Sequence, residues 1–249
     1  MTRAVADAAA RWRDPAFPPR VRALAGVASR TGYSIPVVTY AFDRLFESVT
    51  LDALESTIAR EIGGRRTEPL GRVAVISSRT TIGVAIVPAI FALCAGCDVL
   101  VKDREDDLVR SFFQTLDDNV TFEAQAWEGP SRDLSPFDAV VAFGGDDALR
   151  AIRAQLAPTA RFIPYGPKAS IGYIVREALR DDIASRQIAD GAARDLVLYD
   201  GEGCLSLHVL FVERGGSIEP ERFAEILAAA VVDAERAFPI GTRDPAAAA

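Results

Sequence analysis

From Gly71 onward, short runs of β-branched residues alternate with longer stretches of helical spacing. The runs 72–78, 98–102 and 139–143 have the composition of strands, and the stretches that separate them are long enough for helices. The run 139–143 is apolar at every position, which is typical of a strand covered on both faces. The alternation predicts an α/β protein with a mostly parallel open sheet and helices on both faces.

The other predicted elements continue this alternation, and the segment before Gly71 is predicted to be helical. The predicted helices are 20–30, one or two within 37–62, 82–95, 107–116, 146–156, 174–191 and 220–238, and the further strands are 121–128, 161–165 and 208–212. We expect an N-terminal helical segment at 1–70, an α/β domain at 71–192, and the start of a second α/β domain at 193–240. Residues 241–249 lack a packing pattern and are expected to form a tail.

The charge of the chain argues against nucleic acid as a partner. The formal net charge at pH 7 is -7 and the arginines are scattered, whereas binding to a phosphate backbone needs clustered Lys and Arg.

The cysteines and the apolar runs bear on the compartment. Three cysteines cannot form a disulfide framework and leave at least one thiol free, which fits a reducing environment. The longest uncharged stretch, 82–97, contains Pro88 and is shorter than the ~20 residues needed to cross a bilayer. The N-terminus lacks the apolar run of a signal peptide. We therefore expect a cytoplasmic protein without a membrane span.

Two positions at the ends of predicted strands could bind an anionic ligand. In Phe143-Gly-Gly-Asp-Asp147, a strand ends in two glycines and a helix begins, so backbone N–H groups are open to a phosphate. The alternative is a turn that needs glycine for its conformation, with the two aspartates capping the helix and repelling an anion. Lys102 ends a strand at the edge where open α/β sheets bind ligands, but it also begins a charged run typical of solvent-exposed residues.

Cys204 is the candidate nucleophile. It follows the glycine-rich stretch Asp200-Gly-Glu-Gly203, which could hold the sulfur in the open beside backbone N–H groups. The alternative is a small buried apolar residue. His208, the one histidine, lies four residues further, ~13 Å away along an extended strand, which is too far for direct proton transfer. Cys94 and Cys97 end an apolar helix without further ligands nearby, so we interpret them as core residues rather than a zinc site.

Taken in order, four segments resemble landmarks of the aldehyde dehydrogenase superfamily, and most closely the fatty acyl-CoA reductases of bacterial bioluminescence. They are Ala95-Gly-Cys-Asp-Val-Leu-Val-Lys102, Phe143-Gly-Gly145, Tyr165-Gly-Pro-Lys168 and Gly203-Cys-Leu-Ser-Leu-His208. The resemblance covers about 71–212, and it implies a dinucleotide-binding domain at 71–192 and a partial catalytic domain at 193–240.

The resemblance also implies a role for each of these positions. Lys102 would contact the adenine ribose of NADP or NAD, Gly144 and Gly145 would lie beneath its phosphates, and Gly166 and Lys168 would complete the cofactor site. Cys204 would accept the acyl group of an acyl-CoA or a similar activated acyl substrate. Hydride from the nicotinamide would then release an aldehyde.

The chain departs from the superfamily pattern at three places. Pro164 and Tyr165 stand where aldehyde-oxidising members carry a glutamate, so the base for hydrolysis is missing and reduction is favoured. The position of the usual oxyanion asparagine falls near Arg79, within 77–81. The sequence also stops soon after the nucleophile strand, so a homo-oligomer or a partner subunit is expected to complete the catalytic domain.

Two further hypotheses stay open at the level of sequence. The chain could be a non-catalytic interaction or scaffolding protein of the same family, or one subunit of a split enzyme. It could also be a cysteine hydrolase or thiol acyltransferase that uses Cys204 without a cofactor, although no histidine is well placed to serve as its base.

Overall fold

The computed structural model describes residues 1–65, 68–78, 80–102, 108–116, 122–125 and 133–242. By its internal contacts the chain divides into two compact units. The described residues of the first unit lie within 1–31 and 38–166, and those of the second unit are 32–37 and 167–242.

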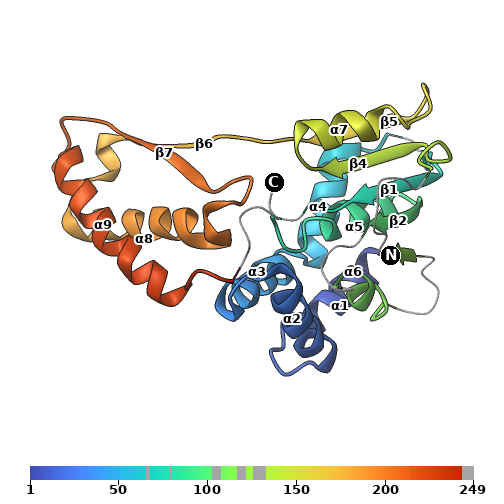
Figure 1. Cartoon of the computed structure of the whole chain (residues 1–249), viewed down its shortest axis with the longest axis horizontal. Helices are drawn as coiled ribbons and strands as arrows, with labels where there is room; N and C mark the ends of the chain where they lie inside the picture. Colours follow the sequence, from blue (N-terminus) through green and yellow to red (C-terminus); the bar gives the residue numbers. More distant parts are fainter. Residues whose placement is uncertain (66–67, 79, 103–107, 117–121, 126–132, 243–249) are drawn as a thin grey trace. The chain divides into compact units, whose positions relative to one another are not determined.

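The first unit is built on a five-stranded sheet with the order β3-β2-β1-β4-β5, in which every neighbouring pair is parallel (Figure 1). The strands are β1 (Arg72–Ile76), β2 (Asp98–Lys102), β3 (Phe122–Gln125), β4 (Ala139–Phe143) and β5 (Arg161–Tyr165). Val73, Ala74, Val75 and Ile76 in β1 are all buried, as expected of a strand with helices on both faces. The predicted α/β fold with a parallel sheet is confirmed.

Helices connect the strands and form the N-terminal segment of the first unit. They are α1 (Thr2–Trp12), α2 (Pro18–Thr31), α3 (Ile35–Ser48), α4 (Leu51–Ile62), α5 (Ile86–Cys94), α6 (Leu108–Phe113) and α7 (Asp146–Arg153). The bounds of α4 follow from its ends: Thr50 accepts a hydrogen bond from the N–H of Ala53, and Gly63 takes a left-handed conformation with φ of 57°. The helical character predicted before Gly71 is confirmed, although α1 was not among the predicted helices.

An aromatic cluster joins the N-terminal helices to α6. The ring of Trp12 lies 5.0 Å from that of Phe46 and 5.9 Å from that of Phe112, measured between centroids. Arg20 is 2% exposed beside this cluster, and its guanidinium donates to the carbonyl of Trp12 at 2.8 Å and to Asp43 at 2.7 Å. A buried charge needs such partners, so Arg20 fixes the packing of α2 on α1 and α3.

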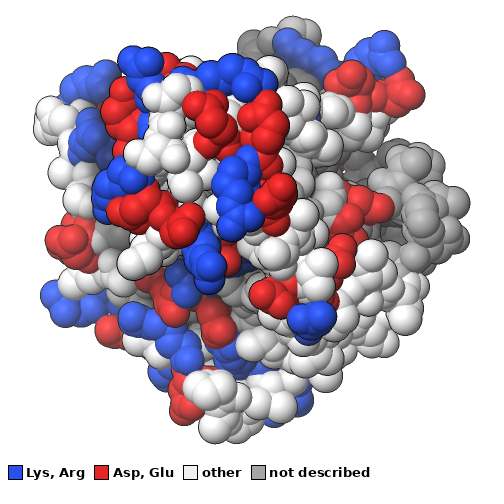
Figure 2. Space-filling view, turned by 90° about the vertical axis from the view of Figure 1, so that its left-hand side faces the viewer, with Lys and Arg blue, Asp and Glu red and all other residues white. Residues whose placement is uncertain are grey.

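The second unit contains a pair of parallel strands covered by two helices on one side. The strands are β6 (Ser170–Ile174) and β7 (Leu207–Val212), and the helices α8 (Asp182–Val197) and α9 (Pro220–Ala237) pack against each other. Their shared core contains the buried residues Ile174, Leu179, Ala189, Ala193, Phe223 and Ala230. Figure 2 views the chain from the side of these helices, where acidic and basic side chains are interspersed.

The other face of the β6–β7 pair is apolar and uncovered. Ile171 and Val209 are register partners, as are Tyr173 and Phe211, and the exposed fractions of these four residues run from 44% to 64%. Strand alternation places them opposite Ile174, Leu210 and Val212, which pack on the core of α8 and α9. Parallel strands are normally covered on both faces, so this apolar face is a surface that another polypeptide could cover.

Two predicted helices begin later than expected. Ile174 ends β6, residues Arg176–Ala178 form a 3₁₀ turn, and α8 begins at Asp182 because Asp181 caps it by accepting from the N–H of Ala184 at 2.7 Å. The predicted helix at 174–191 is therefore wrong over its first eight residues, and β6 was not predicted. The helix predicted from 82 begins at Ile86, because Gly83 with φ of 71° interrupts the preceding turn.

The boundary between the two units falls after Gly166, whereas the sequence predicts that the α/β domain continues to residue 192. Helix α8 packs on α9 and beside β7, so it belongs with the second unit. None of the helices in the described part of the chain combines the length and apolar character that crossing a membrane requires.

The uncovered apolar face should make the isolated chain self-associate. We expect sedimentation velocity to show association that rises with concentration, and Phe211→Arg to shift the protein toward monomer because it places a charge in the centre of the face. The control is Ile183→Arg, an equally drastic change at a residue that is 72% exposed on α8. A wild-type chain that stays monomeric at all concentrations would contradict the expectation.

Candidate functional site

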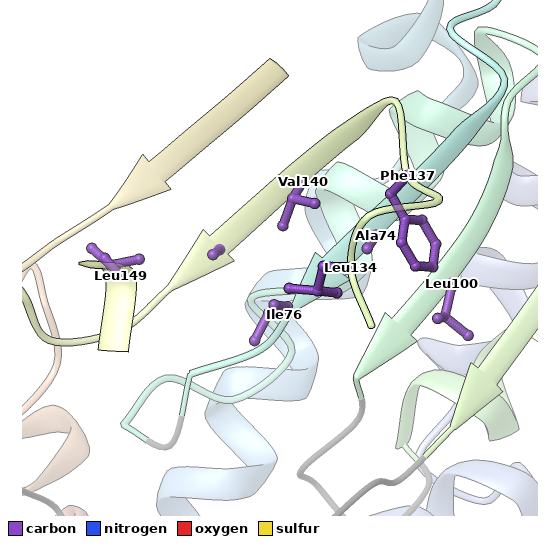
Figure 3. Close-up of a cluster of buried hydrophobic side chains, with 8 residues drawn as sticks. Ala74, Ile76, Leu100, Leu134, Phe137, Val140 and Leu149 are labelled. Atoms are coloured by element: carbon purple, nitrogen blue, oxygen red, sulfur yellow. The ribbon is translucent and has the colours of Figure 1, made fainter. Parts of the chain in front are cut away.

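A cluster of buried apolar side chains covers one face of the five-stranded sheet next to the candidate ligand-binding edge. Ala74, Ile76, Leu100 and Val140 lie on this face together with Leu149 of α7 (Figure 3). Full burial of a valine, leucine or isoleucine side chain stabilises a fold by roughly 1.5–3 kcal/mol. The core therefore holds β1, β2 and β4 in fixed register up to their carboxyl ends.

The strand order defines where a ligand can bind. From β1 the chain proceeds to β2 and β3 on one side, and then returns to place β4 and β5 on the other side. Right-handed crossovers put the connecting helices of the two halves on opposite faces, which leaves a crevice at the carboxyl ends of β1 and β4. Open α/β sheets bind dinucleotides at this switch point.

Lys102 is the last residue of β2 and lies at this edge. It is register partner of Ile76, so its side chain is on the same face as Leu100, and its carbonyl accepts from the N–H of Ser77 at 3.3 Å. The residue is 8% exposed. The interpretation of Lys102 as a solvent-exposed member of a charged run is therefore wrong, because the residue is buried.

Gly144 and Gly145 form the turn from β4 into α7. Gly145 has φ of -69° and ψ of 164°, and neither glycine takes a positive φ, so the backbone conformation does not require glycine. A Cβ at Gly144 would meet Ala148 at an ordinary 3.5 Å, and a Cβ at Gly145 would meet nothing within 4 Å. Neither a positive φ nor a tight contact therefore requires glycine at these two positions. The bare backbone at Gly145 instead leaves open space at the edge.

Two acidic residues and a third glycine lie close to this turn. Asp146 and Asp147 are exposed in the first turn of α7, neither caps the helix with a side-chain hydrogen bond, and Asp147 forms an ion pair with Arg150. Gly166 follows β5, where a Cβ would approach Leu149 to 3.4 Å. Lys168 is exposed and belongs to the second unit.

Cys204 lies in the second unit, in the loop between α8 and β7, and it is exposed. Gly203 and Ser206 on either side of the exposed pair Cys204 and Leu205 are buried. Ser206 is 5% exposed, its N–H donates to the carbonyl of Gly203 at 2.9 Å, and its hydroxyl donates to the carbonyl of Leu198 at 3.4 Å. The hydroxyl of Ser170 in β6 donates to the carbonyl of Cys204 at 3.4 Å. The loop is thus anchored on both sides while its thiol stays open, and the buried-cysteine alternative is wrong.

The loop begins with a conformation that the sequence did not indicate. Tyr199 and Asp200 have φ of 58° and 54°, and among the described residues they are the non-glycine positions with positive φ. The ring of Tyr199 packs edge-on against that of Tyr33 at 5.6 Å, and the carboxylate of Asp200 accepts from the N–H of Gly241 at 3.4 Å. Left-handed residues of this kind each raise the free energy of the fold by about 1–3 kcal/mol and often occur at functional loops.

The remaining predicted positions have plain environments. His208 is an exposed residue of β7. Cys97 is 7% exposed and Cys94 is half-buried, where burial raises the pKa of the thiol. Within the described ranges no cluster of His, Cys, Asp and Glu could hold a metal ion. Position 79, near which the oxyanion asparagine was expected, lies outside the described residues.

Comparison of the sequence with known proteins assigns the chain to a family. The sequence model of the acyl-CoA reductase family LuxC matches residues 125–249, which is half of the chain. The chain belongs to the LuxC acyl-CoA reductase family. A relative within it is long-chain acyl-protein thioester reductase 2 of Photobacterium leiognathi, which is 32% identical over 82 residues that make up 33% of this chain and 16% of that protein.

Solved structures show that this LuxC-family chain has an aldehyde dehydrogenase fold. Aldehyde dehydrogenase 21 of Physcomitrella patens is similar with a TM-score of 0.66 and 14% identity over 95% of this chain and 52% of that one. The NAD-dependent benzaldehyde dehydrogenase of Corynebacterium glutamicum has a TM-score of 0.65 and 13% identity, and the match covers 96% of this chain and 57% of that one. An NADP-dependent enzyme of E. coli has a TM-score of 0.66 and 15% identity, and the match covers 92% of this chain and 50% of that one. The chain thus spans about half the length of these structures, and its family and fold are those of oxidoreductases.

The three cysteines should differ sharply in reactivity. With iodoacetamide at neutral pH, we expect Cys204 to be alkylated first because its thiol is exposed, and Cys97 last because it is buried. Cys94 should react slowly at neutral pH and faster as the pH rises, because its raised pKa keeps the thiol protonated at neutral pH and the thiolate is the nucleophile. Peptide mass spectrometry over time, with Cys204→Ser as control, measures the order. Alkylation of Cys94 or Cys97 ahead of Cys204 would contradict the assigned burial.

Proposed function

We propose that the chain carries the nucleophile and the cofactor-binding edge of an NAD(P)-dependent acyl-CoA reductase, with Cys204 as the acyl acceptor. The observation that carries the proposal is the exposed thiol of Cys204 on a loop whose neighbours Gly203 and Ser206 are buried, in a member of the LuxC family. The relative from Photobacterium leiognathi is named as an acyl-protein thioester reductase, which fits the same chemistry.

The first half of the reaction needs a thiolate and a fixed loop. The sulfur of Cys204 attacks the carbonyl carbon of the acyl thioester, a carbon–sulfur bond forms, and the bond to the CoA sulfur breaks to release the CoA thiol. The product is an acyl thioester on Cys204. Anchoring of the loop by Ser206 and Ser170 keeps the sulfur in one place, so little entropy is lost when the substrate carbon reaches it.

The second half of the reaction needs a reductant, and the residues at the sheet edge fit a dinucleotide. Lys102 would hold the adenine ribose, and the open backbone at Gly145, beside Gly144, would lie against the phosphates. Gly166 and Lys168 are the further proposed contacts. The reduced dinucleotide, NADPH or NADH, would supply the hydride that converts the acyl group to an aldehyde, and the carbon–sulfur bond would break to return the thiol of Cys204.

The residues that replace the usual base favour reduction over hydrolysis. Pro164 and Tyr165, at the exposed end of β5, have no carboxylate to activate a water molecule. An acyl group on Cys204 would then persist until it is reduced. The three free thiols are consistent with work in a reducing compartment such as the cytoplasm.

A second candidate function, that of an interaction subunit, is favoured by the apolar face of β6 and β7. A surface that presents Ile171, Tyr173, Val209 and Phe211 is a good site for another polypeptide, because its burial removes large apolar groups from water. A second copy of the chain or a partner subunit that supplies more of the aldehyde dehydrogenase fold would suit it. This role is compatible with the first, as in an enzyme completed by its partner.

Acyl transfer to the protein is the direct test of the proposed function. With a radiolabelled long-chain acyl-CoA and no reductant, we expect the full chain to acquire one label that hydroxylamine removes, because a thioester is cleaved by it. Cys204→Ala should lose the label completely, while Cys97→Ala should keep it. Absence of labelling from acyl-CoA in the wild-type protein, or equal labelling of Cys204→Ala, would contradict the proposal.

A further inference from the structure

Two aromatic rings are stacked at the carboxyl edge of the sheet in the first unit. Phe143 ends β4 and Tyr165 ends β5, and the two residues are register partners. Their ring centroids are 4.7 Å apart and their planes differ by 11°, so the rings lie face to face. The N–H of Gly144 donates to the carbonyl of Tyr165 at 3.2 Å, which ties the two strand ends together beneath the rings.

The stack is open to a further ring. Phe143 is half-buried, whereas Tyr165 is 45% exposed although one face of its ring lies on Phe143. A parallel pair at the exposed end of two strands is a preformed platform for a planar ligand, because every planar heteroaromatic ring can stack on it. Gly144 and Gly166 follow the two rings directly, so no side chain at those positions stands beside the platform.

The position of the stack fits one end of a dinucleotide. Lys102, on β2, shares a face with Ile76 and Ala142, so Phe143 and Tyr165 project to the opposite face. Three strand spacings separate β2 from β5, which amounts to ~14 Å. A dinucleotide whose adenosine lies at Lys102 and whose phosphates pass Gly145 crosses the edge and brings its second ring toward Tyr165.

We propose that the ring of Tyr165, supported from behind by Phe143, stacks on the nicotinamide ring and positions it. The inference rests on the proposed function, because it requires that a nicotinamide dinucleotide binds at this edge. It gives Tyr165 a role in ligand binding beyond its part in strand pairing. Cross-strand aromatic pairs also stabilise sheets, so the test has to separate ligand stacking from strand pairing.

The test compares ligands with and without the nicotinamide. Isothermal titration calorimetry on the full chain measures the affinity for NAD⁺ and for ADP-ribose, which lacks the nicotinamide. The same comparison is made between NADP⁺ and 2′-phospho-ADP-ribose. Tyr165→Ala should weaken binding of the complete dinucleotide about tenfold, which corresponds to about 1.4 kcal/mol, and leave the truncated analogue unchanged. Tyr165→Phe keeps the ring and should bind like the wild type.

The matched control is Ile163→Ala, since Ile163 lies two residues earlier on β5, on the same face, and is 43% exposed. Thermal unfolding of each variant, followed by circular dichroism, checks that the sheet is intact. If Tyr165→Ala weakens binding of the dinucleotide and of its truncated analogue equally, or weakens neither, the inference is overturned while the proposed function stands. A wild-type chain that binds neither ligand overturns the cofactor part of the proposed function itself.

Discussion

The switch in direction between β1 and β4 is the constraint on which the rest of the site depends. Because β2 and β3 extend the sheet on one side of β1, and β4 and β5 on the other, the connecting helices leave toward opposite faces. The carboxyl ends of β1 and β4 therefore stay uncovered between them. Lys102 and the Gly144–Gly145 turn gain a common location from this topology, although they are more than forty residues apart in sequence.

The second unit meets a different requirement, which is to keep one thiol in the open. Tyr199 and Asp200 take left-handed conformations, and contacts with Tyr33 and Gly241 accompany them. Such a conformation persists when its surroundings outweigh the strain. The buried Ser206 on the other side of the loop completes the anchoring, so exposure of Cys204 reflects the structure around it and not a loosely held loop.

Much of the sheet could be predicted from the sequence, because its strands are short β-branched runs that end in turn residues. β2, β4 and β5 have the predicted bounds. The boundary between β6 and α8 was harder to predict, because five residues of alternating apolar character next to a helical stretch do not show where the strand ends and the helix begins. The capping of α8 by Asp181 decides that boundary.

The sequence is enough to propose residues for the candidate site, but it does not indicate the environment of each residue. Lys102 begins a charged run, so its sequence context favours solvent, whereas the structure buries it at the end of β2. Tyr199 and Asp200 carry no sequence signal for a left-handed backbone, which glycine and asparagine usually provide. The stack of Phe143 on Tyr165 depends on strand register, and register emerges from the assembled sheet.

The proposed function requires that the carboxyl edge of the sheet binds a nicotinamide dinucleotide. A crystal structure of the chain soaked with NADP⁺ or NAD⁺ tests it most directly. We expect density for the dinucleotide across the ends of β1 and β4, with a ribose hydroxyl within hydrogen-bond distance of the ammonium of Lys102 and a phosphate against the backbone of Gly145. Density for the dinucleotide at any other location, or none at saturating concentration, would contradict it.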